Sequence, residues 1–273
     1  MDQRKKINKY RILSTNISST NYEEALNTII NYAIKRKGFS VSALAVHGTM
    51  ESYNNINLNN VINNIDLVLP DGQPLKWGLN LFYDQQLNDR VCGPDITNLL
   101  LEKSEQNNLR VLFYGSSLET LKKMEINLKN KHSNLIDPIF IPSNFKQTTQ
   151  DEQIRIAKKI ESYNPNIVFV GLGCPRQEYW VYENKEFINA PLIAVGAAFD
   201  YLAGNIERAP SVMQNYGLEW MYRLFQDPKR LFYRYIVLNS LFMKHFIFQF
   251  FNKSYKKFHN SRQNYKVTRQ FWS

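Results

Sequence analysis

Short apolar segments alternate with longer amphipathic segments through most of this chain, and this alternation limits its possible folds more than any other feature. The apolar segments are rich in β-branched residues and too short for helices, which indicates strands buried on both faces. Strands that alternate with helices form a largely parallel sheet covered by helices on both sides. Strands are predicted at residues 41–46, 65–69, 111–114, 136–141, 167–170 and 192–195, and the main helices at 20–37, 73–81, 95–106, 118–129 and 149–163.

The stretch 167–180, IVFVGLGCPRQEYW, is the most informative of these units. Gly171 and Gly173 follow the strand, and they let the backbone turn sharply and approach a ligand. Pro175 suits the first turn of a helix, and a helix N-terminus presents unpaired N–H groups and a partial positive charge. The unit therefore predicts a site for an anion such as a diphosphate, although turns of this kind also occur for structural reasons alone.

The chain carries 34 Lys and Arg against 24 Asp and Glu, and the excess is confined to its C-terminal part. From Pro228 onward there are ten Lys or Arg and no Asp or Glu, which leaves 24 basic and 24 acidic residues before it. A chain of 273 residues, 44% of them hydrophobic, can bury the core of one large domain. We therefore predict a neutral body over residues 1–207 and a basic appendage over 208–273 that meets a polyanion, either a membrane surface or nucleic acid.

The appendage is predicted to be helical, with helices over 214–225 and from 227 to about 251. Its segment 231–251 is apolar, but Arg234 and Lys244 interrupt it, and charges at bilayer depth are costly, so we exclude a membrane span. An interfacial helix with one apolar side and one basic side fits better. A core helix or an oligomer-interface helix is the alternative, and covering the apolar side away from a membrane would favour a homo-oligomer.

Cysteine usage and the N-terminus both indicate a cytoplasmic protein. Cys92 and Cys174 are too few for a disulfide framework, and they lack the His and Cys spacing of a zinc site. The basic start, MDQRKKINKYRIL, lacks the apolar core and the cleavage site of a signal peptide. Together with the interfacial helix, this predicts a peripheral protein on the inner face of the cytoplasmic membrane.

Two polar residues follow predicted strands, at the edge where open α/β sheets bind ligands. Asp71 stands in a Pro-Asp-Gly turn, and His47 lies in a loop between a strand and a polar helix. A carboxylate held in this way can act as a general base, and an imidazole titrates near neutral pH. Each also has a structural interpretation, because Asp-Gly sequences stabilise their own turns and a lone His beside a strand is often packed. Both residues are therefore candidates for a catalytic base.

Several motifs occur in one order and spacing over about residues 40–235. They are Leu69–Leu75 with Trp77, Arg90–Asp95, Phe113–Gly115, Gly171–Glu178, Val195–Asp200, Ala203–Gly204, Arg208–Pro210, Gly217–Trp220, Tyr222–Leu224 and Pro228–Arg230. Each motif is weak alone, but the ordered set is specific, and it resembles the WecG/TagA/CpsF bacterial glycosyltransferases, also called glycosyltransferase family 26. One departure is His47-Gly48-Thr49, where much of the family has Thr-x-Asn, and it leaves the donor sugar open.

The resemblance implies a Rossmann-like fold and an inverting, metal-independent transfer of a sugar from a UDP-sugar donor. It implies an acceptor saccharide on a polyprenyl diphosphate carrier at the membrane, for teichoic acid, capsule or exopolysaccharide synthesis. The matching family aspartate is the proposed base, which favours Asp71 over His47. No cofactor is implied, and the chain has no Asp-x-Asp motif that would hold a metal on the diphosphate.

A diphosphate held without a metal needs charge and hydrogen bonds from the protein, which arginine and glutamine side chains can supply. The predicted substrate-binding residues are Thr49, Gln73, Arg90, Gly93, Asp95, Gly115, Gly171, Gly173, Pro175, Gln177, Glu178, Gly196 and Asp200. The resemblance places arginines of the appendage near the carrier diphosphate. The predicted acceptor or membrane residues are Arg208, Arg223, Arg230 and Arg234.

Two other functions compete with the transferase. A dinucleotide-dependent oxidoreductase would share the fold class, but it requires G-x-G-x-x-G after the first strand, and Gly171-Leu172-Gly173 lacks the third glycine. A nucleic-acid-binding protein would explain the basic aromatic appendage. It would leave the glycine loops at the strand ends unexplained, so no nucleic-acid partner is expected.

Overall fold

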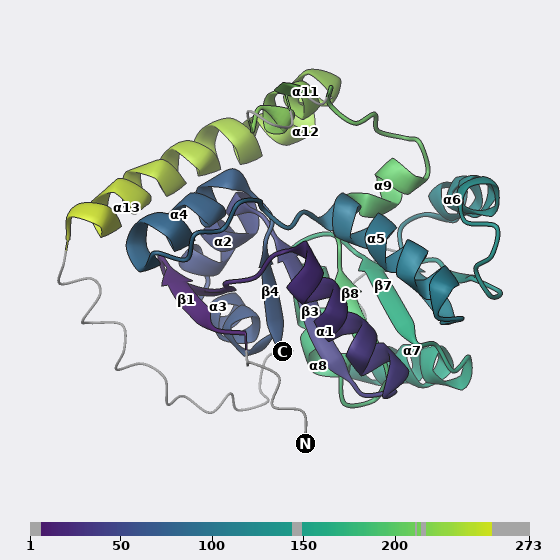
Figure 1. The fold of residues 1–273 in the computed structure, drawn as a ribbon. Helices are drawn as coiled ribbons and strands as arrows, with labels where there is room; N and C mark the ends of the chain where they lie inside the picture. Colours follow the sequence, from purple (N-terminus) through teal and green to yellow (C-terminus); the bar gives the residue numbers. More distant parts are fainter. Residues whose placement is uncertain (1–6, 144–148, 211, 214–216, 253–273) are drawn as a thin grey trace.

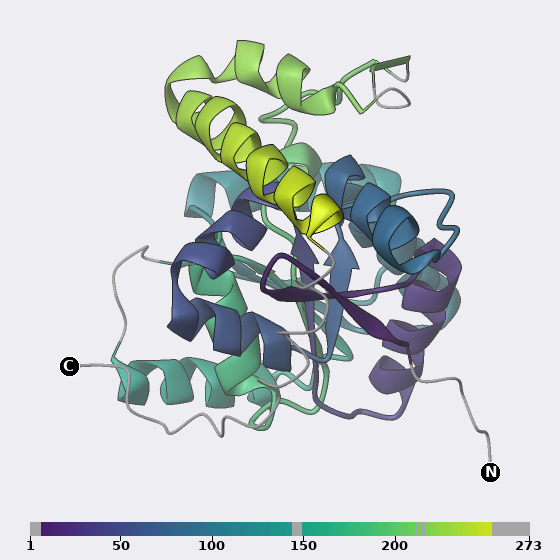
Figure 2. The same ribbon diagram turned by 90° about the vertical axis from the view of Figure 1, so that its left-hand side faces the viewer.

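The structure is a computed structural model that describes residues 7–143, 149–210, 212–213 and 217–252 (Figure 1). In this part of the chain, six parallel strands form one sheet in the order β4-β3-β8-β7-β5-β6. Their bounds are β3 Phe39–Leu44, β4 Leu67–Pro70, β5 Val111–Gly115, β6 Ile139–Ile141, β7 Ile167–Gly171 and β8 Pro191–Ala194. Helices cover both faces of the sheet, which confirms the predicted α/β, Rossmann-like class (Figures 1 and 2).

The sheet divides the core into two layers, and β7 shows why its sequence is apolar throughout. Ile167 and Phe169 point into one layer, whereas Val168 and Val170 point into the other. All four side chains are fully buried. A central parallel strand therefore has no solvent-facing side on which a polar residue could alternate.

Each layer contains the buried side of several helices. On one face lie α1 (Tyr22–Ile34), α5 (Gly93–Gln106), α6 (Leu118–Lys131) and α9 (Ala198–Leu202). On the other lie α2 (Val46–Asn54), α3 (Ile56–Asn64), α7 (Gln150–Ser162) and α8 (Arg176–Asn184). This arrangement leaves the carboxyl ends of the strands as the open edge of the sheet.

The C-terminal helices cross this open edge. They are α11 (Glu219–Gln226), α12 (Pro228–Phe232), the π-helical turn η1 (Tyr233–Leu238) and α13 (Asn239–Phe251). In Figures 1 and 2, α13 runs beside α4 (Gln73–Tyr83) above the sheet. Phe242 and Phe246 of α13 belong to the core layer that includes Leu79 and Phe82 of α4. The appendage is therefore helical, as predicted, and its last described helix packs into the body.

A β-hairpin that the sequence pattern did not predict holds the end of α13. It consists of β1 (Lys9–Ile12) and β2 (Thr15–Ser18), which pair antiparallel. The backbone N–H of Leu13 donates to Gln249 Oε1 at 2.8 Å, and Gln249 Nε2 donates to the carbonyl of Arg11 at 3.1 Å. The two ends of the described chain are thus joined across 236 positions of sequence.

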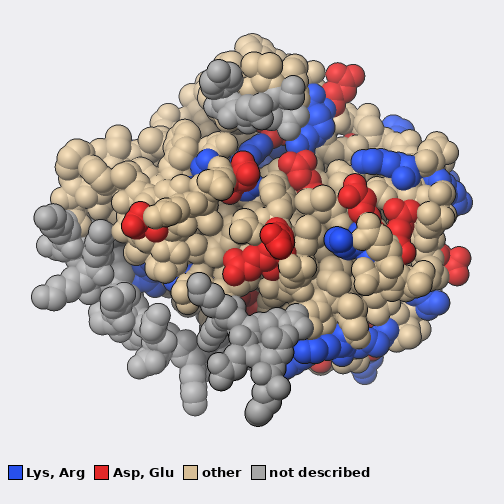
Figure 3. Space-filling view, in the orientation of Figure 1, with Lys and Arg blue, Asp and Glu red and all other residues tan. Residues whose placement is uncertain are grey.

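The outer side of the C-terminal helices exposes apolar side chains. The most exposed are Phe225, Phe232, Tyr233, Ile247, Phe248 and Phe251. Few charged side chains lie over α4 and α13 on the face drawn in Figure 3. No helix within the described ranges is both long and apolar enough to cross a bilayer. The predicted basic extension beyond residue 252 lies outside the described residues, and the boundary at 207/208 stays a prediction.

Candidate active site

A cleft of about 720 Å³ opens at the carboxyl edge of the sheet. The loops that follow β3, β4, β5, β7 and β8 line it from below, and the C-terminal helices line it from above. This is the edge at which doubly wound sheets bind ligands, and the volume lies in the range of small-molecule sites. The strand order and the returning helices therefore combine to build one enclosed site from segments far apart in sequence.

Asp71 lies in this cleft, directly after β4. Its backbone N–H donates to the carbonyl of Leu44 at 3.1 Å, which ties the turn to β3. Its carboxylate Oδ2 accepts a 3.1 Å hydrogen bond from the N–H of Gly93. A Cβ at Gly93 would lie 2.8 Å from the carbonyl oxygen of Val195, so glycine is needed for this close approach. The carboxyl group is therefore held rigidly and faces the cleft.

Burial raises the pKa of Asp71 from 3.8 to about 6. The guanidinium groups of Arg90 and Arg223 and the N–H of Gly93 act in the opposite direction, and the carboxylate of Glu219 reinforces the increase. A carboxyl group with a pKa near 6 is deprotonated at neutral pH and still basic enough to accept a proton from a hydroxyl group in a transition state. Asp71 thus has the position and the proton affinity of a general base.

His47 also lines the cleft, but it lies in the first turn of α2 and not in a loop, which corrects the prediction. The helix begins at Val46 because the chain turns directly at the end of β3. Burial and the nearby charges of Arg234 and Arg223 lower the pKa of His47 to about 3. Its Nε2 atom is buried without a hydrogen-bond partner. A histidine with this pKa is neutral at physiological pH and is a weak base.

Gln177 and Glu178 form a buried polar group at the cleft, in the first turn of α8. Gln177 Nε2 donates to Glu178 Oε1 at 2.9 Å, and Ser42 Oγ donates to the same oxygen at 3.1 Å. Gln177 Oε1 accepts from the N–H of Gly196 at 3.2 Å. Burial raises the pKa of Glu178. These bonds join the first turn of α8 to the loop after β8 and to β3, and so fix the shape of the cleft.

The structure brings most of the predicted site residues together. Those that line the cleft are His47, Asp71, Gln73, Arg90, Gly171, Gly173, Gln177, Glu178, Gly196, Asp200, Arg223, Arg230 and Arg234. Gly173 has a φ of +78°, and nothing lies within 4 Å of the place of its missing Cβ, so its backbone is open to a ligand.

Other predicted residues lie beside the cleft without lining it. They are Thr49, Gly93, Asp95, Gly115, Pro175 and Arg208. Thr49 is fully buried, and its hydroxyl donates to the carbonyl of Ala45 at 3.2 Å within α2. Gly115 has a φ of +121°, and a Cβ there would lie 2.5 Å from the carbonyl oxygen of Gly171. Thr49 and Gly115 therefore support the walls of the site and do not face its interior.

The C-terminal helices supply most of the positive charge in the cleft. Arg223, Arg230 and Arg234 line it, and Arg230 forms an ion pair with Asp227 at 2.5 Å. Within the described residues, Arg223 and Arg234 form no ion pair with a carboxylate, and Arg223 stacks on the ring of Tyr201. Their charges are available to an anionic ligand.

Several lining residues were given no role by the sequence pattern. They are Trp77, Ser116, Ser117, Thr120, Tyr201, Glu219, Trp220, Tyr235, Asn239, Phe242 and Met243. Glu219 was the most detectable of these, since it and Asp227 are the two acidic residues in the otherwise basic segment 208–273. No group of three or more His, Cys, Asp or Glu side chains that could hold a metal occurs in the described ranges. The metal-free reaction stays a prediction.

Comparison with known proteins identifies the family. The chain matches the family described as "Glycosyl transferase WecG/TagA/CpsF family" over residues 10–256. A protein of Bacillus spizizenii, named N-acetylglucosaminyldiphosphoundecaprenol N-acetyl-beta-D-mannosaminyltransferase, is 31% identical over 230 residues, which cover 84% of this chain and 85% of the relative. A Bacillus subtilis protein of the same name is 32% identical over 171 residues, or 62% of this chain and 64% of the relative. The chain therefore belongs to the WecG/TagA/CpsF family of glycosyltransferases.

Proposed function

We propose that this enzyme transfers N-acetylmannosamine from a UDP-linked donor to N-acetylglucosamine on a polyprenyl diphosphate, with inversion at the anomeric carbon. The sugar and the acceptor are those in the names of the two Bacillus relatives. The product would be a lipid-linked disaccharide for a cell-envelope polymer, such as a teichoic acid, a capsule or an exopolysaccharide.

The position of Asp71 is the observation that carries the proposal. Its carboxyl group faces a cleft lined by the glycine turns after β7 and β8, and burial raises its pKa to about 6. In a single displacement, the acceptor oxygen forms a bond to the anomeric carbon while the bond from that carbon to the diphosphate oxygen breaks. The hydroxyl proton goes to Asp71, and the bonding electron pair leaves with UDP. Attack on the face opposite the leaving group inverts the anomeric carbon.

The arginines of the cleft support the departure of UDP without a metal. The diphosphate carries negative charge that increases as the bond breaks, and guanidinium groups can stabilise it with paired hydrogen bonds. Arg223 and Arg234 come from the C-terminal helices, and Arg90 comes from the body. The open backbone of Gly173 offers a further approach to an anion. Asp200, also in the cleft, is available to a sugar hydroxyl group.

The C-terminal helices also support work at a membrane surface. Exposed aromatic and aliphatic side chains such as Phe232, Phe248 and Phe251 lie on the outer side of helices whose Arg223 and Arg234 line the cleft. An interfacial position on the inner leaflet would place the cleft close to a lipid-linked acceptor. Anionic lipid is expected to increase the rate, because it attracts the basic C-terminal segment.

Transfer by the purified full-length chain tests the proposal. UDP-N-acetylmannosamine, UDP-glucose, UDP-galactose and UDP-glucuronic acid are each offered with a lipid-linked N-acetylglucosamine acceptor in vesicles of neutral or anionic lipid. We expect a β-linked disaccharide from UDP-N-acetylmannosamine, more of it on anionic vesicles, and an unchanged yield with a chelator. Transfer from a different donor would correct the sugar, and strict dependence on Mg²⁺ or Mn²⁺ would overturn the metal-free mechanism. Absence of transfer from every donor would overturn the function.

A further inference from the structure

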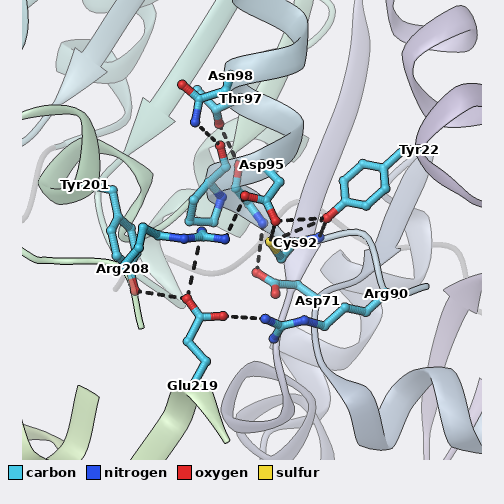
Figure 4. A network of polar contacts seen from close by, with 12 residues as sticks. Tyr22, Asp71, Arg90, Cys92, Asp95, Thr97, Asn98, Tyr201, Arg208 and Glu219 are labelled. Atoms are coloured by element: carbon cyan, nitrogen blue, oxygen red, sulfur yellow. Dashed lines mark hydrogen bonds and ion pairs between the residues drawn. The ribbon is translucent and has the colours of Figure 1, made fainter. Parts of the chain in front are cut away.

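Glu219, near the start of α11, connects the C-terminal helices to the side of the cleft that holds Asp71 (Figure 4). Its Oε2 atom forms an ion pair with Arg90 of the body. Its Oε1 atom accepts a 3.4 Å hydrogen bond from the hydroxyl of Tyr201 and lies 3.8 Å from Nη1 of Arg208. Both carboxylate oxygens are therefore engaged, by groups from three separate segments.

Glu219 is buried, so α11 can pack against the body only while these contacts are formed. The residue is 7% exposed, and the side chain of Arg90 is 19% exposed. A carboxylate removed from water is stable only when cations and hydrogen-bond donors replace its hydration. If α11 left the body, Arg90 would lose its partner and Glu219 would return to solvent.

Arg90 is shared between Glu219 and Asp71. Besides Arg90, the charged and titratable groups that act on Asp71 are Cys92 from the loop before α5, Glu219 and Arg223 from α11, and Tyr235 from η1. Figure 4 shows the guanidinium end of Arg90 next to the carboxylates of both Asp71 and Glu219. One cation therefore lies beside both the predicted base and the acid that anchors α11.

We propose that Glu219 is a positioning residue of the transfer reaction, which holds the Arg90 guanidinium beside Asp71 and prepares the base only while α11 is docked on the body. This inference rests on the proposed function. Glu219 touches no reacting atom in this role. It acts through Arg90, whose charge it partly neutralises, and through its own negative charge, which favours the protonated form of Asp71.

The effect of removing the charge of Glu219 has a definite sign. In Glu219→Gln, the amide oxygen can still accept a hydrogen bond from Arg90 and keep it in place, but Asp71 loses a neighbouring negative charge, and the full charge of Arg90 acts on it. Both changes lower the pKa of Asp71, so the base stays deprotonated to lower pH. The acid limb of the kcat/KM profile is expected to move down by about one pH unit, the lower end of the effect of a nearby charge. A purely structural role would reduce the rate equally at each pH and leave the limb in place.

Arg208→Gln gives the opposite test. Arg208 lies on the other side of Glu219 and pairs with Asp95 at 2.7 Å. Its removal leaves Glu219 less neutralised, which raises the pKa of Asp71 and moves the acid limb to higher pH. Glu125→Gln is the matched control, because Glu125 pairs with Lys129 on the surface of α6. The acid limb of the kcat/KM profile of this variant is expected to match that of the wild type. Opposite shifts in the two variants cannot arise from a general loss of folding.

The proposal can also be tested by an NMR titration of Asp71, which does not depend on measurable sugar transfer. Aspartate carboxyl carbons are labelled with ¹³C, and the NMR signal of Asp71 is assigned as the one that is missing in Asp71→Asn. The titration of this signal with pH is then followed in the full-length wild type, Glu219→Gln and Arg208→Gln. Opposite shifts of its titration midpoint support the proposal. If the wild type transfers sugar but Glu219→Gln shifts neither the acid limb nor the titration midpoint of Asp71, the role of Glu219 is overturned and the proposed function is not. A wild type that transfers no sugar from any donor overturns the proposed function instead, whatever the midpoints show.

Discussion

The backbone N–H of Gly93 donates a 3.1 Å hydrogen bond to Oδ2 of Asp71. This bond orients the carboxyl group toward the cleft, and in the proposed reaction Oδ1 would receive the hydroxyl proton of the acceptor. It also defines the most conservative test of the base, because the amide oxygen of an asparagine can accept the same bond.

Asp71→Asn is therefore expected to keep the fold and lose the base. A general base contributes about 10²- to 10⁴-fold to the rate, so kcat should fall by a factor in this range. The measurement is initial-rate transfer to the lipid-linked acceptor, with circular dichroism as the control for folding. Near-normal turnover in this variant would remove Asp71 as the base.

The rate is expected to depend on pH through Asp71. Only the deprotonated carboxylate can accept the hydroxyl proton, and burial raises its pKa to about 6. The kcat/KM value should therefore rise as pH increases through about 6 and level off above it. A profile measured from pH 4.5 to 8.5 in buffers of constant ionic strength tests this. A profile that is flat across pH 6 would contradict the assignment.

Stability should change with pH in the opposite direction. Because the pKa of Asp71 is higher in the folded chain than its ordinary value of 3.8, the folded state binds the proton more tightly. The stabilising contribution is fully present below pH 4 and is lost as pH rises through about 6. Asp71→Asn carries no charge to bury, so its melting temperature should exceed that of the wild type at pH 8 and equal it near pH 4. A lower melting temperature for the variant at pH 8 would count against this account.

His47→Gln separates the two candidate bases. The pKa of His47 is lowered to about 3, so the residue is neutral throughout the working range. The variant is expected to retain the acid limb near pH 6, whatever change it makes to KM for the donor. If His47 were the base, the variant would lose that limb together with most of its turnover.

Phe246→Ala tests whether α13 is part of the core. Phe246 is 7% exposed, and its ring lies 4.7 Å from that of Phe82 on α4, centroid to centroid. Loss of a buried Phe side chain costs about 3–5 kcal/mol of unfolding free energy. Phe251→Ala is the control on the same helix, since that side chain is 77% exposed and its loss should change the unfolding free energy little. Urea denaturation measures both, and equal values for the two variants would show that α13 does not pack on α4.

The sequence predicted the sheet and, within one residue, the ends of β4 and β7, because these depend on local composition, whereas β3 ends two residues before its predicted end. A run such as Ile167–Val170 has no polar side, so it fits only a strand covered on both faces. Asp71 follows β4 directly and Gly173 lies two residues after the end of β7, which puts both at the open edge of any parallel sheet built from these strands. The β-hairpin was missed because β1 and β2 are four residues each and carry little alternation, and its stability comes from contacts with distant elements, namely β4, α3, α4 and Gln249 of α13.

The sequence by itself determined the α/β class, the glycine turns and the neutral body with its basic C-terminal segment, since each is a property of neighbouring residues. Only the tertiary structure decided which charges meet. Glu219 and Arg90 lie 129 positions apart, and no local pattern relates them. The proton affinity of Asp71 was decided in the same way, because burial in the cleft and the charges around it exist only once the C-terminal helices have crossed the open edge of the sheet.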